Sequence, residues 1–247
     1  MELEFPFDPV RRSEEAERLV MSGGKRLYHK FRAAPYYGGI ATADAVGCSF
    51  LCAYCWNYGR NLDPARFGRF TAPDEVARIL LRIARRRFFR LYRITGSEPI
   101  LGEASFHHLL KVVTYILREE PRSEFVLETN GLLLGYTEGL AEQLRIPNLS
   151  VRVSLKGTDE NFFEKITGAR RNFFPYPLRA LRNLEERGVR VWPALMGDFF
   201  TEEDVNRLKR TLQEFGIRAG LETESLEPYP FVLENLRKRG IIRAETL

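Results

Sequence analysis

The sequence places all of its cysteines in one short segment. Among 247 residues only three are Cys, and they are Cys48, Cys52 and Cys55 in the stretch CSFLCAYC. An odd number of cysteines argues against a disulfide framework. Spacings of three and two intervening residues allow one short loop to present three thiolates to a single compact ligand. The identity of that ligand determines the chemistry of the segment.

Three kinds of site fit such a segment. A structural zinc ion takes four ligands, usually Cys or His, but the sequence has no fourth Cys, and its three histidines are His29, His107 and His108. A reactive thiol cluster without a fixed role is the second alternative. The third is a [4Fe-4S] cluster, which normally takes four Cys. Three thiolates leave one iron open to a small molecule, as catalytic metal sites do.

The stretch CSFLCAYC resembles the C-x3-C-x2-C signature of the radical S-adenosylmethionine (SAM) superfamily, and the aromatic Tyr54 before the last Cys fits that pattern. The resemblance implies that Cys48, Cys52 and Cys55 hold a [4Fe-4S] cluster whose open iron chelates SAM. It also implies reductive cleavage of SAM to a 5′-deoxyadenosyl radical, which abstracts hydrogen from a substrate. A low-potential electron donor, ferredoxin or flavodoxin, is then expected, and the net charge of +5 would suit an acidic donor.

The chain around this segment alternates predicted strands with amphipathic helices. Residues 1–37 are interpreted as a polar lead-in with a single helix from Ser13 to Val20, and residues 38–247 are expected to form one domain. Helix signals include Thr71 as an N-cap before Pro73 and a capping box at Thr201. Six runs are predicted as strands from their apolar or alternating character: 40–46, 90–95, 124–129, 151–155, 189–195 and 217–222.

Six strand–helix units predict an α/β fold with a parallel sheet. They are too few for a closed eight-stranded barrel and suit an open, partial TIM-type barrel. The (β/α)6 core that the superfamily resemblance implies has the same number of units. Helices are also expected over 137–144 and 230–239, and His107 and His108 are interpreted as surface or packing residues of a further helix.

Polar residues follow the predicted strand ends, where barrel enzymes place their active sites. Gly96, Ser97 and Glu98 resemble the GGEP motif of the family, which holds the amino group of SAM, although Ser97 replaces the second Gly. Glu222 and Glu224 fall on the same rim. By the same resemblance, or because their hydroxyl or ammonium groups suit SAM, we expect further cofactor contacts from Tyr54, Thr129, Asn130, Ser154, Lys156, Ala194 and Leu195.

The substrate is not evident from the sequence. No Cys follows Cys55, so no auxiliary cluster is expected, which argues against a cyclase of the molybdenum-cofactor type. We expect a stand-alone radical SAM enzyme of unassigned substrate, with a protein and a tRNA among the candidate partners. Its rivals are a glycyl-radical activating enzyme and a tRNA-base modifier similar to that of the wybutosine pathway. A non-catalytic iron–sulfur or zinc protein is the alternative from another class.

The sequence also carries no sign of a membrane segment. No stretch approaches the roughly 18 apolar residues that a membrane span needs. The N-terminal residues contain no apolar signal region. We therefore expect a cytoplasmic protein without a membrane partner.

Overall fold

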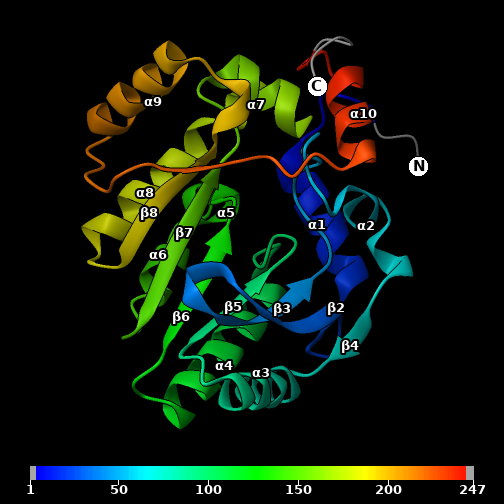
Figure 1. Ribbon diagram of the computed structural model, residues 1–247, viewed down its shortest axis with the longest axis vertical. Coiled ribbons are helices and arrows are strands. Elements are labelled where there is room, and N and C mark those ends of the chain that lie inside the picture. Colours follow the sequence, from blue (N-terminus) through cyan, green and yellow to red (C-terminus); the bar gives the residue numbers. More distant parts are fainter. Residues whose placement is uncertain (1–3, 243–247) are drawn as a thin grey trace.

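The chain folds around one mostly parallel sheet (Figure 1). The computed structural model describes residues 4–242. Within them the strands pair in the order β1-β2-β3-β5-β6-β7-β8-β9, and β4 pairs with β2. The strands from β3 onward in this order run parallel to one another: β3 (Ile40–Ala45), β5 (Leu91–Thr95), β6 (Glu124–Thr129), β7 (Leu149–Leu155), β8 (Arg190–Met196) and β9 (Glu222–Glu224).

Helices connect each parallel strand to the next, because parallel pairing requires a crossover. Figure 1 shows α3 beside α4, and α5 and α8 on one side of the sheet. None of the helices in the described part of the chain is long and apolar enough to cross a membrane. The crossover helices are α2 (Tyr58–Leu62), α3 (Pro73–Arg87), α4 (Glu103–Glu119), α5 (Leu132–Tyr136), α6 (Leu140–Gln143), α7 (Glu160–Thr167), α8 (Pro175–Glu186) and α9 (Glu202–Glu214).

The two faces of the parallel strands differ in character, since successive side chains of a strand point to opposite faces. The outer face is apolar and packs into the main core, as Ala43, Ile94 and Val153 do. The inner face carries charged residues that line a cavity, among them Arg93 and Arg152. A closed eight-stranded barrel fills its interior with apolar side chains. The polar inner face of this partial barrel therefore suits a ligand better than a packed core.

The predicted fold class, an α/β partial barrel, is confirmed, and strand 124–129 has the predicted bounds. The sixth predicted strand, 217–222, is wrong in position, since β9 begins only at Glu222. Ile217 instead donates its backbone N–H to Leu212 O and closes the end of α9. The helix expected over 137–144 is shorter than predicted, because α6 begins at Leu140, after Gly139 with its φ of 80°, and α5 before it was not expected.

The predicted capping box at Thr201 is confirmed. The N-cap predicted at Thr71 is wrong. Thr71 is the last residue of β4 (Arg69–Thr71) and pairs with Arg26, and the helix caps at Ala72 before Pro73. Thr71 thus serves the sheet rather than the helix.

The N-terminal residues contribute more to the sheet than the sequence indicated. After α1 (Pro9–Val20), capped by Asp8, the chain forms β1 (Met21–Ser22) and the ten-residue β2 (Lys25–Ala34). Strand β2 pairs antiparallel with β3 from Tyr28 opposite Ala45 to Ala34 opposite Ile40. The expectation of a lead-in with one helix is therefore incomplete. The division into residues 1–37 and 38–247 stays a prediction.

The C-terminal helix α10 (Pro230–Lys238) packs against the cysteine segment. Val232 and Leu236 of this helix form a small apolar cluster with Ala53. Beyond it, the Arg239 guanidinium donates to Leu51 O at 3.2 Å. The last described helix thus holds the cysteine loop from outside.

Candidate functional site

The three cysteines lie on a loop between β3 and α2 that the backbone holds firmly. Leu51 N donates to Thr167 O at 3.0 Å, and Ala53 N donates to Ile166 O at 2.8 Å. These two bonds fasten the loop to the end of α7. The loop leads from the carboxyl end of the first parallel strand, where barrel enzymes place their catalytic groups.

All three thiols line one cavity of about 840 Å³. Burial raises the pKa of Cys48 and of Cys52 to about 12, and neighbouring thiols add to this, Cys52 for Cys48 and Cys55 for Cys52. A bound metal stabilises such thiolates outright. No three His, Cys, Asp or Glu side chains within residues 4–242 already converge as a metal site. The donor set is three thiols on one short loop facing one cavity, with Cys52 buried and Cys48 and Cys55 half-buried, and it fits the iron–sulfur cluster that the sequence predicted.

Amide groups surround the sulfur atoms as hydrogen-bond donors. Asn130 Nδ2 lies 3.8 Å from Cys48 Sγ, and Asn61 Nδ2 lies 3.6 Å from Cys55 Sγ. The backbone N–H of Phe50 also donates to Cys48 Sγ, at 3.4 Å. Such donors stabilise ligating thiolates and tune the potential of the group they hold. Sequence reasoning did not predict Asn61.

The loop after β5 is joined to the cysteine loop. Gly96 has a φ of 83°, and a Cβ there would lie 3.1 Å from Asn57 Nδ2 and 3.2 Å from Asp44 Cβ, so glycine is required. Asn57 Nδ2 donates to Gly96 O. Ser97 Oγ donates to Asn61 Oδ1 at 2.5 Å, and Asn61 in turn reaches Cys55. Ser97, which departs from the family motif, therefore links the two loops.

Glu98 has a structural role as well as a place on the cavity wall. Its carboxylate accepts from Thr129 Oγ1 at 2.7 Å, from Asn130 N at 2.7 Å and from Ile100 N at 3.0 Å. Burial raises the pKa of Glu98 to about 6, although these donors oppose the shift. Asn130 Nδ2 also donates to Ser49 Oγ at 2.8 Å. Glu98, Thr129 and Asn130 thus fasten the loop after β5 to the end of β6.

Lys156 and Tyr54 lie together beside the cysteines. The Lys156 ammonium lies 5.4 Å from the centre of the Tyr54 ring, which stacks on Phe199. Burial alone would lower the pKa of Lys156, but Tyr54, Cys52 and Glu224 outweigh burial and raise it. Lys156 therefore presents a positive charge next to the thiols. Tyr54, Ser154 and Lys156 all line the cavity, as their predicted role requires.

Leu195 is the predicted contact that the structure does not bring to the cavity. Its side chain is 1% exposed and belongs to the apolar core on the outer face of β8. Ala194 is equally buried, and neither residue lines the cavity. Met196, one position further along the strand, does line it. The predicted contact was wrong about the strand face, which alternates with each residue.

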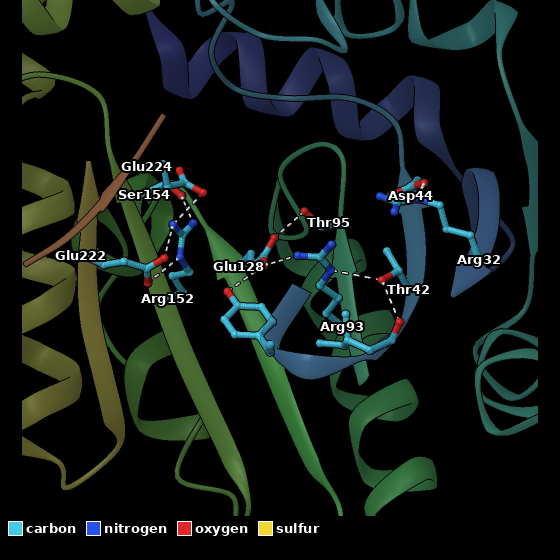
Figure 2. A network of polar contacts seen from close by, with 12 residues as sticks. Arg32, Thr42, Asp44, Arg93, Thr95, Glu128, Arg152, Ser154, Glu222 and Glu224 are labelled. Carbon is cyan, nitrogen blue, oxygen red and sulfur yellow. Dashed lines mark hydrogen bonds and ion pairs between the residues drawn. The ribbon is translucent and has the colours of Figure 1, made fainter. Parts of the chain in front are cut away.

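The inner face of the sheet carries a band of ion pairs that sequence reasoning missed (Figure 2). Arg93 Nη1 lies 2.6 Å from Glu128 Oε1, and the Arg93 side chain is 6% exposed. Arg152, 4% exposed, binds Glu222 at 3.0 Å and Glu224 at 2.8 Å. The signal in the sequence was one charged residue within an otherwise uncharged strand, as in LYRIT and LSVRVSL.

Two further contacts complete this band. Arg32 of β2 binds both carboxylate oxygens of Asp44, at 2.6 and 3.0 Å, and Asp44 is 1% exposed. The Tyr37 hydroxyl donates to Glu128 at 3.0 Å. Burial would raise the pKa of Glu128, but Arg93 and Thr95 lower it overall, so its carboxylate is charged. The band therefore consists of ionised groups, most of them shielded from solvent.

Comparisons with known proteins agree with this geometry. The model of the radical SAM superfamily matches residues 44–212. GTP 3′,8-cyclase 2 of Mycobacterium bovis is 30% identical over 197 residues, which cover 78% of this chain and 51% of the cyclase. GTP 3′,8-cyclase of Mycolicibacterium smegmatis is 34% identical over 62% of this chain and 41% of its own length. The chain thus spans about half the length of these relatives.

Solved structures share the fold at low sequence identity. SuiB of Streptococcus suis bound to S-adenosylmethionine superposes with a TM-score of 0.59 and 17% identity, over 79% of this chain and 44% of SuiB. The native anSMEcpe structure with bound AdoMet gives a TM-score of 0.55 and 18% identity, over 78% of this chain and 55% of that one. The family match covers well over half of the chain, including the cysteine loop and the strands β5 to β8. This chain is an enzyme of the radical SAM superfamily.

Proposed function

We propose that this chain holds a [4Fe-4S] cluster on Cys48, Cys52 and Cys55 and uses it to cleave SAM reductively. The observation that carries the proposal is the convergence of the three thiols and the Gly96 loop on one cavity with a charged inner wall. When bound, the cluster supplies one electron that breaks the sulfonium S–C5′ bond of SAM, giving methionine and a 5′-deoxyadenosyl radical. That radical would abstract hydrogen from a substrate in the same cavity.

The residues of the chain bind, orient and shield in this proposal. The open backbone at Gly96 and Ser97 would face the amino group of SAM, as in the family motif, because glycine allows a close approach. The positive charge of Lys156 would hold a carboxylate or hydroxyl of SAM. Tyr54, stacked on Phe199, excludes water from the neighbouring thiols. Exclusion of water protects a reactive radical from side reactions.

Anaerobic reconstitution tests the proposal directly. The protein is loaded with iron and sulfide, reduced with dithionite and supplied with SAM, and 5′-deoxyadenosine is measured by chromatography. We expect 5′-deoxyadenosine from the native chain and none from Cys52→Ala. Zinc in the anaerobically prepared protein, or a cluster whose spectrum does not change when SAM is added, would contradict the proposal.

The similarity to GTP 3′,8-cyclases supports a nucleoside triphosphate as one candidate substrate. It is limited to about half of the cyclase length, and this chain has three cysteines. A peptide is the second candidate, supported by native anSMEcpe, a solved structure of similar fold with bound AdoMet and a bound peptide. The glycyl-radical, tRNA and ferredoxin or flavodoxin expectations, and the cytoplasmic location, remain predictions. Family membership argues against a non-catalytic metal protein.

A further inference from the structure

The cavity wall away from the cysteines is charged where a fold of this kind would be more stable with apolar side chains. Arg93 and Arg152 are 5% and 4% exposed and lie on the central strands β5 and β7. Burying an ion pair loses hydration that the attraction between the charges does not fully restore. Packing stability alone therefore does not account for the band of ion pairs, whereas recognition of a charged ligand would.

The charges of this wall are separated across the cavity (Figure 2). On the β9 side, Glu222, Glu224 and Glu227 line the cavity with Arg152, which makes three carboxylates against one guanidinium. Lys156 lies near Glu224 as well, and with it the carboxylates still exceed the cations by one. The β9 side of the cavity is therefore acidic.

The opposite side is basic. Lys30 and Arg32 of β2 and Arg60 of α2 line the cavity there with Asp44, which makes three cations against one carboxylate. Arg32 and Asp44 pair with each other, so Lys30 and Arg60 carry the excess. Figure 2 shows the Arg93–Glu128 pair between the two sides, with Arg32 and Asp44 on one flank and Glu222 and Glu224 on the other. The Arg93–Glu128 pair is itself neutral.

One carboxylate on the acidic side can accept a further hydrogen bond or ion pair from a ligand. Both oxygens of Glu222 are occupied, by Arg152 and by Trp192 Nε1. Within residues 4–242, the salt bridge found for Glu224 joins one of its carboxylate oxygens to Arg152 at 2.8 Å. The Glu224 side chain is 41% exposed. A cationic group of a ligand can therefore reach Glu224 directly.

We infer that the substrate of this enzyme is a zwitterion of the peptide type, with its ammonium group toward Glu224 and its carboxylate toward Lys30 and Arg60. This inference rests on the proposed function, because it concerns the molecule from which the radical takes hydrogen. A peptide with free termini matches the polarity of the cavity from one side to the other. A nucleoside triphosphate could place its phosphates near Lys30 and Arg60, but it carries no cation for Glu224, and the acidic side would repel any part of its negative charge placed there.

Retention of peptides by the holoenzyme tests the inference. The probe is a random tripeptide mixture with free termini, incubated with reconstituted, SAM-loaded protein, and bound peptides are identified by mass spectrometry after rapid filtration. The same mixture is offered in N-acetylated form and in C-amidated form. We expect each blocked mixture to be retained at least about tenfold less than the free one, since each lacks one charge. Equal retention of blocked and free peptides, or no retention of any mixture, would overturn the inference.

Two pairs of variants separate the two sides. Glu224→Gln should reduce retention of free peptides about tenfold, whereas Glu214→Gln, an exposed carboxylate on α9, should leave it unchanged. Lys30→Gln should weaken retention about fivefold, and Lys25→Gln, which replaces an exposed lysine at the start of β2, should have no effect. Loss of retention in a control variant equal to that in its partner would also count against the inference.

Two further measurements keep this test distinct from the test of the proposed function. Formation of 5′-deoxyadenosine is measured in the same preparations without peptide. If it forms but peptides are not retained, the substrate class is wrong and the radical chemistry stands. If it does not form, the proposed function fails. GTP is added as a competitor, and displacement of bound peptides by equimolar GTP would assign the cavity to a nucleotide instead.

Discussion

The guanidinium of Arg26 donates to the backbone carbonyls of two consecutive residues, to Glu98 O at 2.7 Å and to Pro99 O at 3.0 Å. Arg26 is 1% exposed and belongs to β2, before the cysteine segment. Glu98 and Pro99 complete the loop that begins with Gly96 and Ser97. A strand from the N-terminal part of the chain thus fixes the shape of the proposed SAM-binding loop.

Replacing Arg26 with methionine should weaken SAM binding. The substitution removes both donors and leaves two carbonyls without them in a buried place, which costs about 1–3 kcal/mol. We expect the Kd for SAM to rise about tenfold by calorimetry on the reconstituted protein, and we expect Arg26→Lys to recover part of the loss. Arg18→Met, an exposed arginine on α1, is the control. Unchanged SAM affinity in Arg26→Met, with a lower melting temperature, would restrict Arg26 to a structural role.

The free energy of unfolding should fall as the pH drops from about 6.5 toward about 4, because of His108. Burial lowers the pKa of His108 from its ordinary 6.5 to about 4. Between these values the unfolded chain binds a proton that the folded chain does not, and His108 alone contributes roughly 3 kcal/mol to this loss. Urea unfolding across this range compares the native chain with His108→Gln, which should show a smaller slope. His107→Gln, on the exposed neighbour, should retain the native slope, and the idea fails if both variants behave alike.

Each cysteine should be necessary for the cluster and unnecessary for the fold. In Cys48→Ala, Cys52→Ala and Cys55→Ala we expect less than a tenth of the native iron and sulfide, since two thiolates hold a cubane poorly. Far-ultraviolet circular dichroism should be unchanged, because no strand of the sheet lies in the cysteine loop. Trp56→Phe keeps all three thiols and should retain its iron. A cysteine variant with full cluster content would show that this cysteine is not a ligand.

Gly135 should tolerate no side chain. A Cβ at Gly135 in α5 would overlap the backbone carbonyl of Tyr176 in α8, and backbone has little freedom to move away. We expect Gly135→Ala to lower the free energy of unfolding by about 2 kcal/mol or more. Gly59 in α2 has open space around its Cβ position, so Gly59→Ala should be neutral or stabilising, as helix propensity favours alanine. Equal stability of the two variants by urea unfolding would argue against the tight α5–α8 contact.

The sequence predicted the fold class and the cysteine loop well, because both depend on local patterns. The spacing of Cys48, Cys52 and Cys55 is fixed within eight residues, and a strand such as 124–129 shows its character in its own composition. Strand β2 was missed because its own residues do not show a strand pattern. Its stretch KRLYHKFRAA shows no regular alternation of apolar and charged residues, and its place in the sheet depends on pairing with β3.

The charged inner face could not be predicted, because its partners lie far apart in the sequence. Arg152 and Glu222 are joined only when β7, β8 and β9 lie side by side, and Arg32 meets Asp44 only through the unpredicted β2. The misplaced Leu195 has a related cause. The face to which a residue points depends on the register of its strand, and a shift of one residue reverses the assignment.

The charged inner face makes the ligand-free enzyme less stable than the same fold with apolar side chains on that face. Replacing a buried ion pair with apolar side chains of similar volume often stabilises a protein by about 1–4 kcal/mol, so a chain with leucine or methionine at Arg93 and Glu128 would melt later and lose its partner molecule. In the native chain, binding of a complementary molecule would restore this stability. The free energy of unfolding then rises with the logarithm of the ligand concentration. A melting temperature that rises with the concentration of an added metabolite would therefore identify the ligand of this cavity.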